Sequence, residues 1–112
     1  MSEFANYLHE VFEDFGAIQT RKMFGGHGVY HQGLMFGLVA DDELYLKVDQ
    51  DNLKHFEAVD LQAFEYIKNG KPYKMSYYQA PESIFDEPQE ALKWAQLAHD
   101  AAIRAAAKKN KR

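Results

Sequence analysis

The spacing of apolar residues at the start of the chain predicts an amphipathic helix over residues 2–15. One face of this helix would carry Phe4, Leu8, Val11, Phe12 and Phe15. The acidic residues of the segment lie away from this stripe. Ser2 suits the N-cap and Gly16 suits the position after the last turn, so both ends of the helix are marked.

The pattern then changes to short apolar runs separated by glycine or by acidic turns, which predicts strands over 22–31, 34–40 and 43–49. Gln32-Gly33 is suited to a two-residue turn between the first two strands. The resulting register places Val29 opposite Phe36, Tyr30 opposite Met35, and Gly28 beside Gly37. We therefore expect a patch of bare backbone that another element or chain can approach closely.

Residues 50–60 contain a short helical segment, with Asp49 or Asp51 as its cap and Leu53 and Phe56 turned inward. A hairpin follows, with strands over 64–68 and 71–78 joined by Asn69-Gly70, a dipeptide that accepts positive φ at both turn positions. Three cross-strand pairs are expected: Phe64 with Met75, Glu65 with Lys74, and Tyr66 with Tyr73. Pro72 cannot donate to the ladder, which favours an edge position near the turn.

A long helix over 87–109 ends the pattern, with Pro88 in its first turn. One face consists mostly of small residues around a tryptophan: Ala91, Trp94, Ala95, Ala98, Ala101, Ala102 and Ala105. On the opposite side, Asp100 and Arg104 stand at the spacing of a favourable helical ion pair. The predicted order is α-β-β-β-α-β-β-α, a single α+β domain over residues 1–112 (core about 2–105) with a mainly antiparallel sheet packed by helices.

Length and composition agree with one globular domain. The chain has 112 residues, 46% of them hydrophobic, and contains no internal repeat or linker. The absence of cysteine excludes disulfide scaffolds, thiolate metal sites and cysteine nucleophiles. No apolar stretch approaches the roughly 20 residues of a membrane span, and the N-terminus lacks the layout of a signal peptide, so we expect a cytoplasmic protein without a membrane partner.

The charge is unevenly distributed along the chain. The net charge is −4, but residues 104–112 hold five basic residues and no acidic one, which leaves 8 basic and 17 acidic residues, a net charge of −9, in residues 1–103. A body this acidic is a poor match for DNA phosphates. The basic end offers a candidate contact to a polyanion through Arg104, Lys108, Lys109, Lys111 and Arg112. We favour the alternative that it complements the carbonyl end of the last helix and stays solvated.

Catalytic and cofactor motifs are missing. The run Gly25-Gly26-His27-Gly28 precedes strand-like residues and not the helix that a phosphate loop requires. His27 and His31 would lie about 13 Å apart along a strand, too far for one metal ion. No serine occupies a nucleophile elbow. We therefore predict a protein that is not an enzyme and that needs no cofactor or metal.

The tyrosines and lysines of the strands leave two interpretations open. Tyr45, Lys47, Lys74, Tyr77 and Tyr78 could form a surface that stacks bases or contacts proteins. The interpretation we favour has each tyrosine bury its ring and leave its hydroxyl at the rim. Because the body is acidic, a protein is the better partner for such a surface than a nucleic acid.

Several segments resemble the TfoX N-terminal-domain family. They run from Lys22 to Tyr30, from Gly33 to Gly37, from Leu44 to Asp49, and on through Phe64-Glu65-Tyr66, Met75-Ser76-Tyr77-Tyr78 and Trp94-Ala95. Family-motif residues with an expected structural or interaction role are Met23, Phe24, Gly25, Gly26, Gly28, Tyr45, Lys47, Tyr77, Tyr78 and Trp94. The resemblance implies a secretion-chaperone-like fold with the same element order.

The resemblance also implies a relation to the bacterial TfoX/Sxy regulators of natural competence, which act with a cyclic-AMP receptor protein. Those regulators carry a second domain, so we expect either a stand-alone relative of their N-terminal half or a truncated part of a longer regulator. The function expected is that of a non-enzymatic regulatory or adaptor domain in transcriptional regulation, which works through protein–protein contact and forms a homodimer. The alternative is an accessory nucleic-acid contact through the basic C-terminal tail.

Overall fold

The computed structural model describes residues 3–23 and 25–109 of the chain. Its first half consists of α1 (Glu3–Val11) and four strands, β1 (Gln19–Met23), β2 (Gly26–His31), β3 (Leu34–Ala40) and β4 (Glu43–Lys47). The second half contains α2 (Leu53–Glu57), β5 (Ala63–Lys68), β6 (Lys71–Gln79), α3 (Ser83–Asp86) and α4 (Pro88–Lys109). The predicted α+β class with an antiparallel sheet is confirmed.

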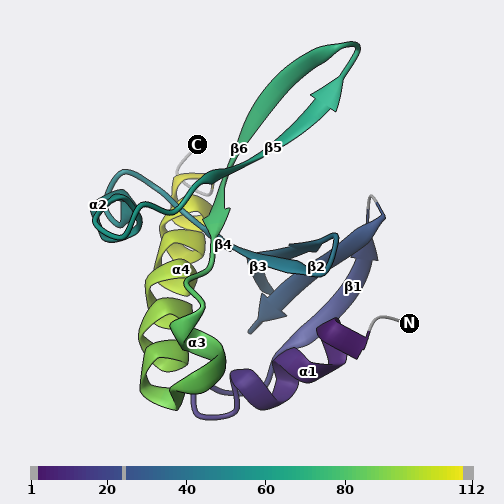
Figure 1. The fold of residues 1–112 in the computed structure, drawn as a ribbon. Coiled ribbons are helices and arrows are strands. Elements are labelled where there is room, and N and C mark those ends of the chain that lie inside the picture. Colours follow the sequence, from purple (N-terminus) through teal and green to yellow (C-terminus); the bar gives the residue numbers. More distant parts are fainter. Residues whose placement is uncertain (1–2, 24, 110–112) are drawn as a thin grey trace.

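The six strands form one antiparallel sheet in the order β1-β2-β3-β4-β6-β5. β6 pairs with β4 only through residues 77–79, and the rest of the β5–β6 hairpin projects beyond the other strands (Figure 1). Asn69 and Gly70 both have positive φ, 55° and 77°, as the predicted tight turn requires. Pro72 lies opposite Ile67 in this projecting part, where no other strand of the described residues pairs with β6 on its other side.

Three element predictions need correction. The strand predicted over 22–31 is two strands, β1 and β2, which pair with each other antiparallel, from Gln19 opposite Tyr30 to Met23 opposite Gly26. Gly25 has φ +79°, so the chain reverses there and does not continue as one strand. The short helix α3 was not predicted, because four residues are too few to show a helical period. The first helix ends at Val11 and continues as turns to Phe15, and its predicted cap, Ser2, lies outside the described residues.

The register of β2 and β3 also differs from the prediction. Tyr30 lies opposite Met35 as expected, but a bulge between Val29 and Tyr30 shifts the ladder by one residue. Val29 is therefore opposite Gly37 and not Phe36, and Gly28 is opposite Leu38, so the expected pairing of Gly28 with Gly37 is wrong. In the hairpin, Glu65 opposite Lys74 and Tyr66 opposite Tyr73 are confirmed, while a shift between Ala63 and Glu65 leaves Phe64 without Met75 as a ladder partner.

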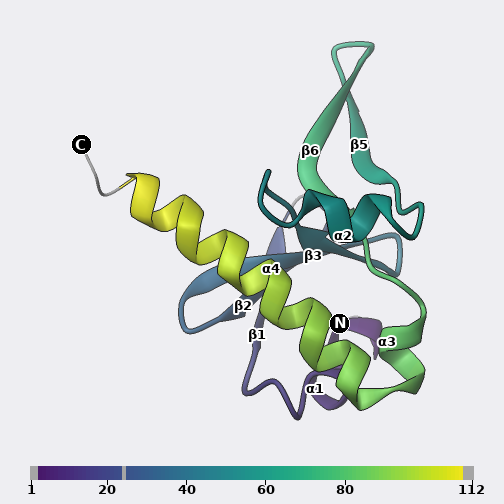
Figure 2. The ribbon, with the colours of Figure 1, turned by 90° about the vertical axis from the view of Figure 1, so that its left-hand side faces the viewer.

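The helices cover one face of the sheet. α4 crosses β3 and β4 (Figure 2), and its small-residue face is buried as predicted, with Ala95, Ala98 and Ala101 completely inaccessible. Small side chains bring the helix axis close to the sheet, and Phe12, Phe36, Phe56 and Trp94 fill the remaining space. Across the described residues, no helix is both long and apolar enough to cross a membrane.

Candidate functional site

The face of the sheet opposite the helices has no helix of the described chain over it (Figure 1). Directly opposed residues of antiparallel strands point to the same face, and Gly28, Leu38 and Tyr45 are opposed in turn across β2, β3 and β4. Lys47 and Tyr77 continue this row two residues further along β4 and on β6. We call this surface the tyrosine face and define it by Tyr30, Met35, Leu38, Tyr45, Lys47 and Tyr77.

Gly28 lies at the centre of the tyrosine face, beneath its side chains. A Cβ at this position would stand 2.9 Å from Met23 Cε, 2.9 Å from Tyr30 Cε1 and 3.2 Å from Met35 Sδ. The absence of a side chain at Gly28 therefore lets these three side chains close over the strand. The predicted bare patch is instead a covered one, and its cover is formed by the surface residues themselves.

Two cations stack on tyrosines of this surface. Arg21 Cζ lies 5.0 Å from the centre of the Tyr30 ring, and Lys47 Nζ lies 5.1 Å from the centre of the Tyr77 ring. Lys47 Nζ also donates to Ser76 Oγ at 3.0 Å. Partial burial lowers the pKa of Lys47, although Asp49 acts in the opposite direction. The lysine is thus held against the ring and is not an extended, fully hydrated cation.

The hydroxyls of Tyr45 and Tyr77 are held in their neutral form. Burial, and to a lesser extent the neighbouring Tyr30, raises the pKa of Tyr77 to about 12. The pKa of Tyr45 is also raised, first by burial and then by its hydrogen bond to Glu43, whose Oε2 accepts from the Tyr45 hydroxyl at 3.1 Å. The Tyr45 ring packs edge-on to Phe64 with centroids 4.8 Å apart. Neutral hydroxyls on fixed aromatic rings suit apolar contact with hydrogen bonding at the rim.

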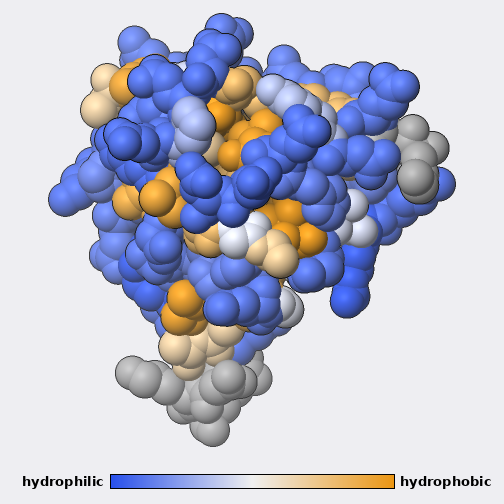
Figure 3. Space-filling model, turned by 90° about the horizontal axis from the view of Figure 1, so that it is seen from below, coloured by the Kyte–Doolittle hydropathy of each residue, from blue (hydrophilic) through white to orange (hydrophobic). Residues whose placement is uncertain are grey.

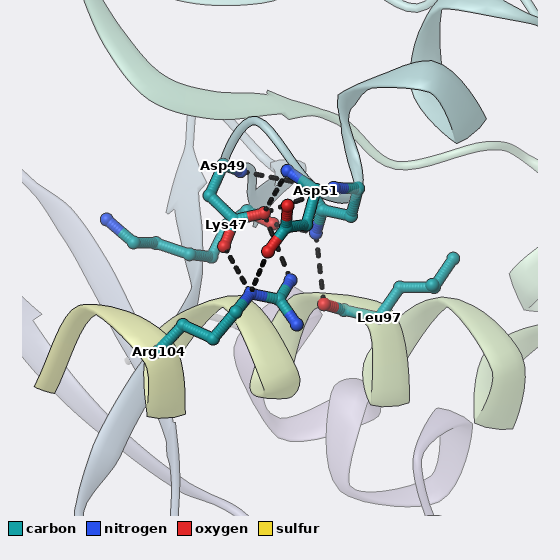
Figure 4. Close-up of polar contacts among 6 residues, drawn as sticks. Lys47, Asp49, Asp51, Leu97 and Arg104 are labelled. Atoms are coloured by element: carbon teal, nitrogen blue, oxygen red, sulfur yellow. Dashed lines mark hydrogen bonds and ion pairs between the residues drawn. The ribbon is translucent and has the colours of Figure 1, made fainter. Parts of the chain in front are cut away.

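A second polar cluster joins the end of β4 to α4 (Figure 4). The Arg104 guanidinium donates to both carboxylate oxygens of Asp49, from Nε at 2.6 Å and from Nη2 at 3.0 Å, and Nε lies 3.2 Å from Asp51 Oδ2. The hydrogen bond from Arg104 is the main cause that lowers the pKa of Asp49. The predicted ion pair of Arg104 with Asp100 is therefore replaced by these contacts. Asp100 Oδ1 instead accepts from Gln96 Nε2.

Asn52 lies within this cluster and is almost completely buried. Its Oδ1 accepts from the Asp49 backbone N–H at 2.8 Å, and its Nδ2 donates to the carbonyls of Lys47 and Leu97 at 3.1 and 3.0 Å. Asp49 Oδ1 in turn accepts from the backbone N–H groups of Asp51 and Asn52 in the turn before α2. The N-cap of α2 is Asn52, so the predicted cap, Asp49 or Asp51, is wrong, and the Asp49 side chain holds the preceding turn instead. These hydrogen bonds occupy the polar groups of Asp49 and Asn52 and hold the end of β4 against α4. The cluster therefore has a structural role.

Two histidines form a further contact beside the core. Their ring centroids are 4.8 Å apart, His31 Nδ1 lies 2.7 Å from the Ala17 carbonyl, and His99 Nε2 lies 3.1 Å from the His31 carbonyl. Both nitrogens therefore serve as donors. Burial is the first cause that lowers the pKa of His99. Within residues 3–23 and 25–109, no group of three or more His, Asp or Glu side chains is arranged to hold a metal ion.

The residues singled out from the sequence divide into three groups. Met23, Gly28, Tyr45, Lys47 and Tyr77 meet on or under the tyrosine face, as their contacts and register show. Tyr78 and Trp94 instead pack on Phe56 within the core, with ring centroids 5.9 and 4.9 Å away. Gly25 forms the β1–β2 turn, and Gly26 is required because a Cβ there would overlap the Val39 carbonyl oxygen. Phe24 lies outside the described residues.

The C-terminal basic residues are not equivalent. Arg104 is engaged by two carboxylates, whereas Lys108 and Lys109 are exposed at the end of α4. Lys111 and Arg112 lie outside the described residues. The sequence pattern did not predict that Tyr30, Met35 and Leu38 belong to the tyrosine face. The bulge between Val29 and Tyr30 interrupts the alternation of faces along the strand, and the sequence alone does not show where it lies.

Together these features define a small α+β domain whose antiparallel sheet has one face covered by helices and the other lined by tyrosine, methionine and stacked cations. The sequence matches the TfoX N-terminal domain family over residues 10–102. The match covers most of the chain, and the chain belongs to this family.

Two curated relatives extend the comparison. The DNA transformation protein TfoX1 of Aliivibrio fischeri is 29% identical over 97 residues, which cover 83% of this chain and 46% of that protein. Protein Sxy of Escherichia coli strain K12 is 24% identical over 103 residues, which cover 92% of this chain and 49% of that protein. The chain therefore spans about half the length of the curated relatives it matches.

Proposed function

We propose that this chain is a non-enzymatic regulatory domain, related to the TfoX/Sxy competence regulators, that acts in the bacterial cytoplasm by binding another protein through the tyrosine face. The carrying observation is the composition of this surface, on which Tyr30, Tyr45 and Tyr77 lie beside methionine and stacked cations. Tyrosine, methionine and arginine are enriched at protein interfaces. The sheet face without a helical cover brings them together, with Tyr30, Met35, Tyr45 and Lys47 partly exposed and with Leu38 and Tyr77 buried beside them.

The chemistry of the surface supports a protein partner over a nucleic acid. Base stacking also uses aromatic side chains, but it is accompanied by a basic groove along the phosphates. Here Lys47 is drawn onto Tyr77 and Ser76, and residues 1–103 carry a net charge of −9. The alternative contact through the C-terminal tail retains Lys108 and Lys109 as exposed cations, while Arg104 is occupied by Asp49 and Asp51.

The experiment is capture of partners from a lysate of the native host, with and without nuclease, using tagged wild-type chain and Gly28→Val. The added side chain meets Met23, Tyr30 and Met35, so the substitution displaces the side chains of the tyrosine face and not those of the core. Arg21→Ala is a second variant, because Arg21 is exposed and stacks on Tyr30. Ala58→Val, at an exposed position after α2, is the matched control.

The expected result is a partner that survives nuclease, is kept by Ala58→Val and is lost by Gly28→Val and Arg21→Ala. Circular dichroism and urea denaturation establish that each variant is folded. The proposal is contradicted if the partner is no longer captured after nuclease treatment. It is also contradicted if Gly28→Val is folded and captures the partner as well as the wild-type chain does. In the first case, removal of residues 108–112 tests the basic tail, whose binding should weaken with salt at a slope of about −0.9 per phosphate neutralised.

A further inference from the structure

A groove on the helical side of the molecule is lined by apolar and acidic side chains. It consists of two hollows on either side of Phe85, whose ring contacts Phe4 and Tyr7 of α1 with centroids 5.9 and 6.2 Å away. Phe85 is only partly buried and Tyr7 is 42% exposed. Seen from below (Figure 3), this side of the molecule shows apolar side chains between hydrophilic ones. We call the two hollows on either side of Phe85, taken together, the Phe85 groove.

The charged side chains that line the Phe85 groove are all acidic. One hollow contains Glu10, Glu13, Asp14 and Asp86, and the other contains Asp42, Glu43, Glu82 and again Asp86. No lysine or arginine of the described residues lines either hollow, and the ion pairs of Arg104 involve Asp49 and Asp51 instead. An apolar floor with an acidic rim is complementary to a segment that combines an apolar anchor with lysines.

The end of α4 is a segment of this kind. Ile103 is 45% exposed although it is a large apolar residue, and Ala107, Lys108 and Lys109 are exposed one turn further on. Ile103 and Ala107 share a helix face through their four-residue spacing. This helix end therefore offers an uncovered apolar side chain next to two cations that no described carboxylate pairs with.

A helix end cannot enter the groove of its own molecule. Pro88, the first residue of α4, lines one of the hollows, and the 22 residues of the helix extend about 33 Å away from it. Figure 2 shows the helix running straight from α3 to the far side of the molecule. Lys108 and Lys109 can therefore reach this groove only in another copy of the chain.

We propose that the Phe85 groove binds the basic end of α4 from a second copy of this chain. Ile103 would sit against the apolar floor, and Lys108 and Lys109 would meet the acidic rim. The proposal concerns a surface different from the tyrosine face. Self-association can therefore fail while partner capture succeeds, and partner capture can fail while self-association succeeds.

The first test is sedimentation velocity of the full chain at low and high salt. Association is expected at about 0.05 M salt and should weaken markedly at about 0.5 M, where screening acts over only a few ångströms. A chain that remains monomeric to about 1 mM at low salt overturns the proposal. Association that is insensitive to salt overturns it as well.

A charge exchange identifies the two sides of the contact. Asp86→Lys and Lys108→Glu are each expected to weaken association about tenfold, because each places like charges at the contact. An equimolar mixture of the two variants should associate again, since the unaltered helix end of Asp86→Lys then meets the unaltered groove of Lys108→Glu, and the altered groove meets the altered helix end. Misfolding of either variant cannot produce this recovery.

Glu57→Lys and Lys54→Glu are the matched controls, because both are exposed residues of α2 and make the same changes in net charge. The controls should associate as the wild-type chain does. Equal weakening by a control and its test variant, or no recovery in the mixture of folded variants, overturns the proposal. A labelled peptide of residues 101–112 should also bind the wild-type chain, and binding to Asp86→Lys should be about tenfold weaker.

Discussion

Replacement of Asn52 tests whether the cluster between β4 and α4 is a structural clamp. Asn52→Ala removes three hydrogen bonds, to the Asp49 N–H and to the Lys47 and Leu97 carbonyls. Each such bond contributes about 1 kcal/mol net to stability, so the free energy of unfolding should fall by about 3 kcal/mol. For a domain of this size, that corresponds to a decrease in Tm of roughly 10–20 °C.

Asn52→Asp also tests whether Asn52 links β4 to α4, and it keeps the shape of the side chain. The carboxylate still accepts from the Asp49 N–H, but it turns an oxygen toward the Lys47 and Leu97 carbonyls in place of the donating Nδ2. Opposed oxygens repel in a site that is 2% exposed. The loss for Asn52→Asp should therefore equal or exceed that for Asn52→Ala.

Urea and thermal denaturation followed by circular dichroism measure these losses at neutral pH. Gln50→Ala, at the exposed neighbouring position, should change stability by less than about 0.5 kcal/mol. A loss below about 1 kcal/mol for Asn52→Ala, together with wild-type stability of Asn52→Asp, would refute the assignment of Asn52 as the link between β4 and α4.

Three further predictions concern the core and the tyrosine face. Burial lowers the pKa of His99 from its ordinary 6.5, so the unfolded chain takes up a proton first and stability should fall as pH drops below 6.5. His99→Gln should make the free energy of unfolding less dependent on pH in urea titrations between about pH 7 and 5. The titratable neighbours of His99 are His31 and Asp100. Tyr77→Phe should remove an absorbance transition near pH 12 from the alkaline tyrosine titration. Ala98→Leu, at a fully buried position of α4, should cost about 1–3 kcal/mol in urea denaturation because the helix must move off the sheet.

The local elements of this fold are readable from the sequence because short-range geometry decides them. Asn69-Gly70 needs no tertiary contact to favour its turn, and the spacing of Ala91, Trp94 and Ala98 defines the buried face of α4 wherever the helix packs. The boundary between β1 and β2 was not readable in the same way. The glycines at 25 and 26 were compatible with a continuous strand, and only the pairing of the two segments with each other separates them.

The site was only partly predictable because its geometry depends on one extra residue. The bulge lies where Phe36 enters the core and packs against Phe12 and Phe15, with ring centroids 5.6 and 5.4 Å away. A shift of one residue changes which side chains are neighbours across the strands. The Arg104–Asp49 contact joins residues 55 positions apart, and no local pattern distinguishes it from the Arg104–Asp100 pair expected from helical spacing.

The tyrosine face and the Phe85 groove should act independently. A hydrogen bond from the Tyr45 hydroxyl to Glu43 Oε2, 3.1 Å long and exposed, joins a residue of one surface to a residue of the other. An exposed bond of this kind contributes about 1 kcal/mol, which corresponds to a coupling of about fivefold in affinity between the two surfaces. Gly28 and Asp86 lie on different surfaces, so the effects of Gly28→Val and Asp86→Lys on partner capture and on self-association should combine additively to within about twofold. A deviation in the double variant larger than the fivefold that this bond can transmit would mean that the sheet itself changes shape when one surface is occupied.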